Sequence, residues 1–173
     1  MIDIVTFDDL KNYKYIADSV KNQTQWPLCV KESQLFDVKT WLGDGLLNEI
    51  LTQVEAGTVT AYNQTLLDGG TYVYGTYTYM FQGLKSVLIY YAFSRFISRA
   101  PYNFTAAGIT VKESDYSNPA EEKAIQRLST EAYLSATAIK EEIELFLKRN
   151  QADYPLYNCG TTSHRARITA IGD

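Results

Sequence analysis

The chain has 173 residues, of which 46% are hydrophobic and 21% are charged, and its formal net charge is -4. This length is enough for one domain with its own hydrophobic core and too short for two domains of ordinary size. The composition excludes a chain that is disordered throughout. The mildly acidic net charge argues against a dedicated nucleic-acid-binding protein, because such proteins are typically strongly basic.

The first ten residues carry three aspartates where a secretory signal would carry an apolar core, and no apolar run reaches 18 residues. The two cysteines, Cys29 and Cys159, are far apart and match no metal-ligand or disulfide-framework spacing. We therefore expect a protein that is made in the cytoplasm, has no membrane segment and resides in a reducing compartment.

Three helices are predicted in the first third of the chain. Thr6 can cap a helix from Phe7 to about Val20, and Trp26-Pro27 is expected to interrupt the helical pattern. A second helix, 31–42, has apolar residues at steps of three and four and ends at Gly43. A third helix begins with Asp44 as its cap and ends at Gly57.

The segment 58–76 is less regular. Residues 58–62 have the composition of a strand, 68–70 that of a turn, and 71–75 alternate threonine and tyrosine with valine. We expect a short hairpin or an irregular loop, and a helical turn over 62–67 is a third possibility.

Two long helices are predicted in the second half. The first runs from about Thr78 to Ser98 and ends before Pro101, with Met80 among its apolar face. The second has Asn118 as cap, Pro119 at its first position and an apolar stripe that continues for some thirty residues, or about 45 Å. A turn and a brief extended segment lie between them.

The predicted fold is mainly α: a helical bundle with a long C-terminal spine helix, a short β-like hairpin or loop and an extended C-terminal arm. We assign residues 1–157 to the helical domain and 158–173 to the arm. Residues 163–171 alternate polar with small or apolar side chains, which favours an extended arm that pairs with another subunit.

No catalytic, cofactor or metal site is expected. His164 is the only histidine, and the chain has only three His or Cys residues in total, too few and too scattered for a usual zinc site. The acidic residues Glu141, Glu142 and Glu144 fall mainly on the solvated side of a long helix, where Glu144 can pair with Lys140 and Lys148. We expect no enzymatic activity.

Fourteen tyrosines are many for this length, and four of them, Tyr72, Tyr74, Tyr77 and Tyr79, crowd one segment. Tyrosine offers a large contact area at low entropic cost, so we favour an interface over a core role for this group. The basic arm adds His164, Arg165, Arg167 and Ile168 as further interface candidates.

Several segments of the second half of the chain form a recognisable order. They are the helix 81–97, the turn Asn103-Phe-Thr-Ala-Ala-Gly-Ile-Thr-Val-Lys112, the motif Ser117-Asn-Pro-Ala120, and the spine helix that ends at 145–148 with Tyr154-Pro155 beyond it. Over about Lys31 to Tyr157 this pattern resembles tailed-bacteriophage head-to-tail connector proteins, particularly those of gut Bacteroidales phages.

The resemblance implies a helical adaptor in the virion neck, assembled in the bacterial host cytoplasm as a homo-oligomeric ring, typically of twelve subunits. Its partners would be the portal protein and the next tail or neck ring, with DNA passing through the lumen without sequence specificity. The arm from about Asn158 onward would clasp the portal, and loops such as 58–76 would meet neighbours. The alternative that the residues leave open is a cytosolic helical binding module for a peptide or small ligand.

Overall fold

The computed structural model describes residues 2–14, 23–99, 102–105, 108–111 and 122–157. The fold is mainly helical, with two small antiparallel hairpins and a long C-terminal helix, which confirms the predicted fold class. The caps predicted for the last helix, Asn118 and Pro119, and the whole C-terminal arm lie outside the described residues.

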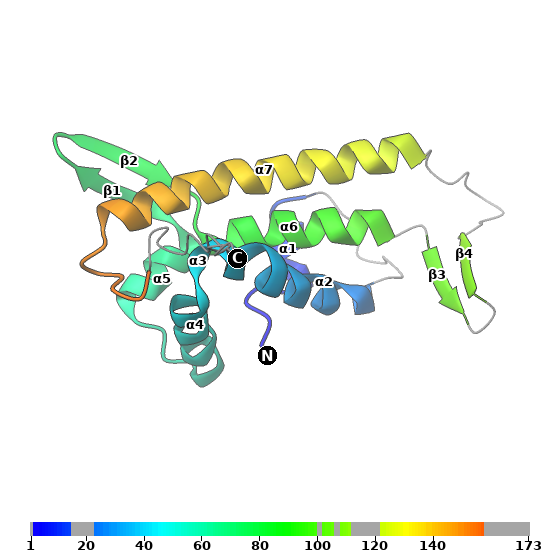
Figure 1. Ribbon diagram of the computed structural model, residues 1–173, viewed down its shortest axis with the longest axis horizontal. Helices are drawn as coiled ribbons and strands as arrows, with labels where there is room; N and C mark the ends of the chain where they lie inside the picture. Colours follow the sequence, from blue (N-terminus) through cyan, green and yellow to red (C-terminus); the bar gives the residue numbers. More distant parts are fainter. Residues whose placement is uncertain (1, 15–22, 100–101, 106–107, 112–121, 158–173) are drawn as a thin grey trace, which may run out of the picture.

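The body consists of three helical layers (Figure 1). Helix α6 (Leu84–Arg99) lies in the middle, helix α7 (Glu122–Arg149) runs along one side of it, and α2 (Trp26–Glu32) packs on the other. Helix α6 is therefore buried over most of its surface, and its core residues include Leu84, Val87, Leu88 and Ala92.

The spine helix α7 has the apolar stripe that the sequence predicts. Six residues at steps of three, four and one are buried: Ala132, Ala136, Ile139, Ile143, Phe146 and Leu147. The stripe does not extend to the beginning of the helix, because Ala124 and Leu128 are exposed. The hydroxyl of Ser94 on α6 donates to the Ser129 carbonyl at 2.9 Å, so small polar residues join the two helices where the apolar stripe ends.

The N-terminal region differs from the prediction. Helix α1 (Phe7–Lys11) starts with the predicted Thr6 cap, whose hydroxyl accepts from the Asp9 amide, but it ends at Asn12 instead of continuing to about Val20. The chain turns there, and the Tyr13 hydroxyl forms a 2.9 Å hydrogen bond with Ser86 of α6. This contact places Tyr13 beside α6 in place of a continuing helix.

Trp26 and Pro27 begin a helix, although we expected them to break one. A short 3-10 turn η1 (Gln23–Gln25) precedes α2, and Pro27 stands in the first turn of α2, where its missing amide leaves no hydrogen bond unmade. The helical path then continues through a π-helical segment η2 (Ser33–Val38) and α3 (Lys39–Leu42), and it ends at Gly43 as predicted. Leu35, predicted on the apolar face, is exposed.

Four charged side chains tie this path to α6. Arg95 donates two hydrogen bonds to the Asp37 carboxylate, at 3.0 and 2.9 Å, and Arg99 donates to Glu32 at 2.6 Å. Burial raises the pKa of Asp37, and the bonds from Arg95 oppose that rise. The carboxylates of Glu32 and Asp37 both point from the α2–η2 path toward α6. These ion pairs therefore fix how the two helical layers align.

Helix α4 (Asp44–Ala56) ends at a left-handed Gly57 as predicted, but Asp44 is its first residue and makes no capping bond. Asp44 instead pairs with Lys39 at 2.8 Å across the Gly43 turn. The helical turn over 62–67, which was the third possibility for the segment 58–76, is close to what the structure has. Helix α5 (Ala61–Asp68) follows Thr60, whose hydroxyl caps it. The expected strand at 58–62 is therefore wrong.

A short hairpin is present, but residues 71–74 pair with the segment that follows them and not with 58–62. Strand β1 (Gly70–Tyr74) pairs antiparallel with β2 (Tyr77–Phe81) in a register that sets Tyr72 opposite Tyr79. The residues from Thr78 to Phe81 therefore belong to a strand, and α6 begins six residues later than predicted. Beyond α6, β3 (Tyr102–Thr105) pairs with β4 (Gly108–Val111) where a turn and an extended segment were expected.

Candidate interaction surface

The β1–β2 hairpin projects from one end of the body, next to the C-terminal end of α7 (Figure 1). Because side chains alternate along a strand, its register divides the hairpin into two faces. The four candidate tyrosines share the face that turns toward α7: Tyr72, Tyr74, Tyr77 and Tyr79. The opposite face has smaller side chains: Thr71, Val73, Thr78 and Met80.

Arg149, in the last turn of α7, is held by the tyrosine face. Its guanidinium lies 4.0 Å from the ring centroid of Tyr79 and 4.6 Å from that of Tyr74, and it donates a 3.0 Å hydrogen bond to the Tyr72 hydroxyl. Cation–π contacts and a charge-assisted hydrogen bond thus act on one side chain. Arg149 clamps the hairpin to the end of the spine helix.

The base of the hairpin joins the hydrophobic core through aromatic rings. Phe81 stacks on Phe146 of α7 with centroids 4.0 Å apart, and Tyr72 meets Phe146 edge to face at 5.1 Å. Tyr72 also stacks on Tyr79 at 5.5 Å. A two-stranded hairpin is marginal alone in water, so these contacts and the Arg149 clamp account for its order.

The two ends of the hairpin meet at a pair of glycines. Gly69 and Gly83 both have positive φ, and a Cβ on Gly83 would lie 2.3 Å from the Gly69 nitrogen. Beside them, the Lys85 ammonium binds the Asp68 carboxylate at 2.6 Å, and Gln64 donates to the same carboxylate. The close backbone approach fixes the direction in which the hairpin leaves the body.

The outer part of the hairpin is uncovered. Val73 is 70% exposed, Tyr77 69% and Met80 78%, although all three are large apolar or aromatic residues. Single exposed apolar residues are ordinary on a protein surface, but a group of them on one projecting element is typical of a contact surface. Met80, predicted on the buried face of a helix, belongs to this exposed group.

A second polar cluster lies between α4, α5 and the segment after α7. The buried Asn63 donates to Glu49 at 3.1 Å and to Gln53 at 3.0 Å. The Tyr154 hydroxyl donates to the Tyr62 carbonyl at 2.7 Å, and burial raises the pKa of Tyr154. A shallow hollow opens here, lined by side chains that include Glu49, Tyr62 and Asp153.

Of the predicted interface residues, the structure brings together Tyr72, Tyr74 and Tyr79, and places Tyr77 at the exposed tip beside them. His164, Arg165, Arg167 and Ile168 lie outside the described residues. Sequence reasoning did not identify Arg149 as part of this surface. A lone arginine at a helix end, downstream of four clustered tyrosines, was the available signal.

Within the ranges that the structure describes, no group of three or more His, Cys, Asp or Glu side chains is placed to hold a metal ion. None of the described helices is long and apolar enough to cross a bilayer.

The fold and surface thus define a mainly helical protein that presents an anchored, tyrosine-rich hairpin. The chain belongs to a family of unknown function, DUF6712, whose model matches residues 38–167. This span includes the hairpin and both long helices. No curated protein and no solved structure matches the chain.

Proposed function

We propose that the chain is a structural subunit of a phage neck ring that joins the portal to the tail, with DNA passing through the ring. The observation that carries the proposal is the β1–β2 hairpin, which stands out from the body and is held there by Arg149. The resemblance of residues 31–157 to head-to-tail connectors supplies the class of assembly.

An assembly subunit needs contact surfaces whose shape is fixed before binding, because ordering them on binding reduces affinity. The hairpin meets this need, since three of its tyrosines contact Arg149 of α7 while Val73, Tyr77 and Met80 stay exposed. Tyrosine and methionine are also enriched in protein interfaces. In this proposal the hairpin contacts a neighbouring subunit or the next ring of the neck, in the virion.

The C-terminal arm, residues 158–173, is proposed to clasp the portal. The test is co-sedimentation of the purified chain with the portal protein of the same phage, for the full chain and for a chain that ends at Tyr157. The described body ends at Tyr157, which is buried, so the shortened chain should fold and melt like the full chain while losing the portal.

A full-length chain with Arg165→Ala and Arg167→Ala is the matched control for charge alone. Intermediate binding by this variant would assign part of the affinity to the two guanidiniums. Undiminished portal binding by the chain that ends at Tyr157 would contradict the proposed role of the arm.

The alternative, a binding module for a peptide or small ligand, is favoured by one observation, the hollow beside Tyr62 and Tyr154. A ligand for this hollow would raise the melting temperature in proportion to the logarithm of its concentration, in a chain that remains monomeric. Tyr62→Ala should abolish that shift. A chain that assembles into rings and whose melting does not respond to peptide or small-molecule ligands would contradict the alternative.

A further inference from the structure

Two helical faces on opposite sides of the body carry exposed apolar residues around an opposite charge. On the α2–η2 side, Leu28 is 54% exposed and Leu35 36%, and the exposed Lys31 lies between them in sequence. On the α7 side, Leu134 is 62% exposed and Leu145 43%, with the exposed Glu141 between them. We call these the lysine face and the glutamate face.

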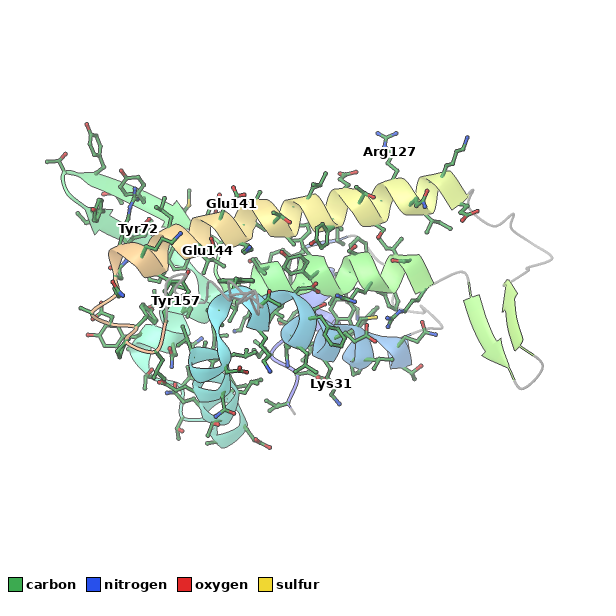
Figure 2. The ribbon with its side chains drawn as sticks, viewed as in Figure 1. Lys31, Tyr72, Arg127, Glu141, Glu144 and Tyr157 are labelled. Carbon is green, nitrogen blue, oxygen red and sulfur yellow. The ribbon has the colours of Figure 1, made fainter. Side chains whose placement is uncertain are left out.

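Both faces are the reverse sides of helices whose other sides are buried against α6. The inner side of the α2–η2 path buries Cys29, Val30 and Val38, and the inner side of α7 buries Ile139 and Ile143. Because α6 lies between the two helices, the faces look in opposite directions, as Lys31 and Glu141 do in Figure 2.

The two charges are available to a partner. Neither Lys31 nor Glu141 forms an ion pair within the described part of the chain; the exposed Arg127 on α7 likewise forms none. Lys31 acts on Asp3 at a distance: burial raises the pKa of that carboxyl, and Lys31 partly offsets the rise. Each face therefore carries a charge that forms no ion pair among the described residues, Lys31 on one and Glu141 on the other, with apolar side chains on either side of it.

We propose that the lysine face of one copy of this chain docks on the glutamate face of the next, with Lys31 paired to Glu141. The inference rests on the proposed ring and specifies which surfaces form it. A contact between two different faces of identical chains is head-to-tail, and it closes into a ring when the rotation per subunit divides a full turn. Two faces on opposite sides of one body allow such head-to-tail contact, because each copy can use both at once.

Charge on α7 also selects the register. Arg127 lies 14 residues before Glu141, or about 21 Å along the helix, and would repel Lys31, so the lysine face is directed to the acidic half.

The direct test is carbodiimide cross-linking, which joins a lysine ammonium to a carboxylate as an amide only when the two are in contact. Ordinary and ¹⁵N-labelled chains are mixed, assembled with the portal protein and treated. Mass spectrometry should find a peptide pair of mixed label that links Lys31 to Glu141 or to the adjacent Glu142. Because the two residues lie on opposite sides of one body, a link within one chain is excluded.

Charge reversal provides the second measurement, by sedimentation velocity over a range of protein concentrations. Lys31→Glu and Glu141→Lys should each raise the concentration needed for assembly at least about tenfold, and the two together should restore it. Glu55→Lys, an exposed reversal on α4 outside both faces, is the control and should leave assembly unchanged.

If rings form but carry no such link and do not respond to the reversals, the docking of these two faces is wrong and the ring itself stands. If the double reversal is as impaired as either single variant, the pairing of Lys31 with Glu141 is wrong. A wild-type chain that stays monomeric at every concentration, with the portal present, overturns both the docking and the proposed function.

Discussion

At the scale of the residue, Arg149 has the largest influence on the proposed contact surface. Its guanidinium contacts three tyrosine rings from two strands, at 4.0, 4.6 and 5.9 Å, so it couples the hairpin to α7 through one side chain. A lysine cannot reproduce the same contacts, because its ammonium is a point charge and does not stack as a planar group on an aromatic ring. The identity of this residue therefore matters as well as its charge.

Replacing Arg149 tests this coupling. Arg149→Ala should lower the free energy of unfolding by about 1–2 kcal/mol, since it removes the cation–π contacts and the bond to Tyr72. The amides of β1 and β2 should exchange with solvent faster, and Arg149→Lys should fall between. Lys148→Ala, at the exposed neighbouring position, is the control; equal hydrogen exchange in both variants would show that no clamp exists.

Asp68 gives a prediction about pH. Burial alone would raise the pKa of Asp68, but the hydrogen bonds from Lys85 and Gln64 outweigh it and hold the pKa below the usual value. The carboxylate then stabilises the fold above the usual pKa of an aspartate, and this contribution is lost as the pH falls through the lower folded value.

Asp68→Asn should therefore reduce stability at pH 7 by less than about 1 kcal/mol, because the pair is partly exposed. Urea unfolding of both chains from pH 7 to pH 2.5 should show the difference shrinking below about pH 4, where the Asp68 carboxylate of the unfolded chain takes up its proton before that of the folded chain does. A difference that stays constant over this range would contradict the assigned role of Asp68.

At the scale of the element, the hairpin shows what the sequence could and could not predict. Helix α4 follows from apolar spacing and the terminal Gly57, and α7 follows from apolar spacing, which are local signals. The start of α6 does not: residues 78–81 continue the apolar spacing of the helix, yet they pair with β1. The choice between helix and strand there depends on contacts with the distant residues Phe146 and Arg149. The spacing of apolar residues within 78–98 carries no information about those contacts.

The same limit applies to the N-terminal region. Thr6 and Asp9 form the predicted cap because a capping bond joins residues that are close in sequence. The end of α1 at Asn12, in contrast, is followed by a long-range hydrogen bond between Tyr13 and Ser86, which are 73 positions apart. Proline at position 27 was ambiguous, since it can end a helix or occupy its first turn. The clustered tyrosines of the candidate interface could be predicted from the sequence. The contact of Arg149 with them could be recognised only once the hairpin register was known.

The glycine pair at the base of the hairpin carries a prediction at this scale. Gly83→Ala should destabilise the chain by more than about 3 kcal/mol, because the new Cβ meets backbone atoms within 2.3 to 2.7 Å and the residue has positive φ. Gly75→Ala is the matched control: it has positive φ with open space around it, so it should cost only about 1 kcal/mol. Thermal unfolding of the two variants compares them directly, and equal losses would contradict the close approach.

At the scale of the whole molecule, three layers of helix produce a stiff body with distinct surfaces. The hairpin leaves one end, and the lysine and glutamate faces lie on opposite sides of α6. In the proposed ring, the two faces join neighbouring copies, while the hairpin and the C-terminal arm are free to meet the components above and below. In that proposed ring, the division of surfaces would let one small chain hold several partners at once.

The most direct measurement is an electron-microscopic reconstruction of the neck of the virions in which we propose that this protein resides. The account predicts a ring of copies of this chain between the portal and the tail, typically twelve, with the β1–β2 hairpin at a contact and DNA in the lumen. Virions whose neck contains no copy of the chain, together with a purified chain that stays monomeric, would contradict the account.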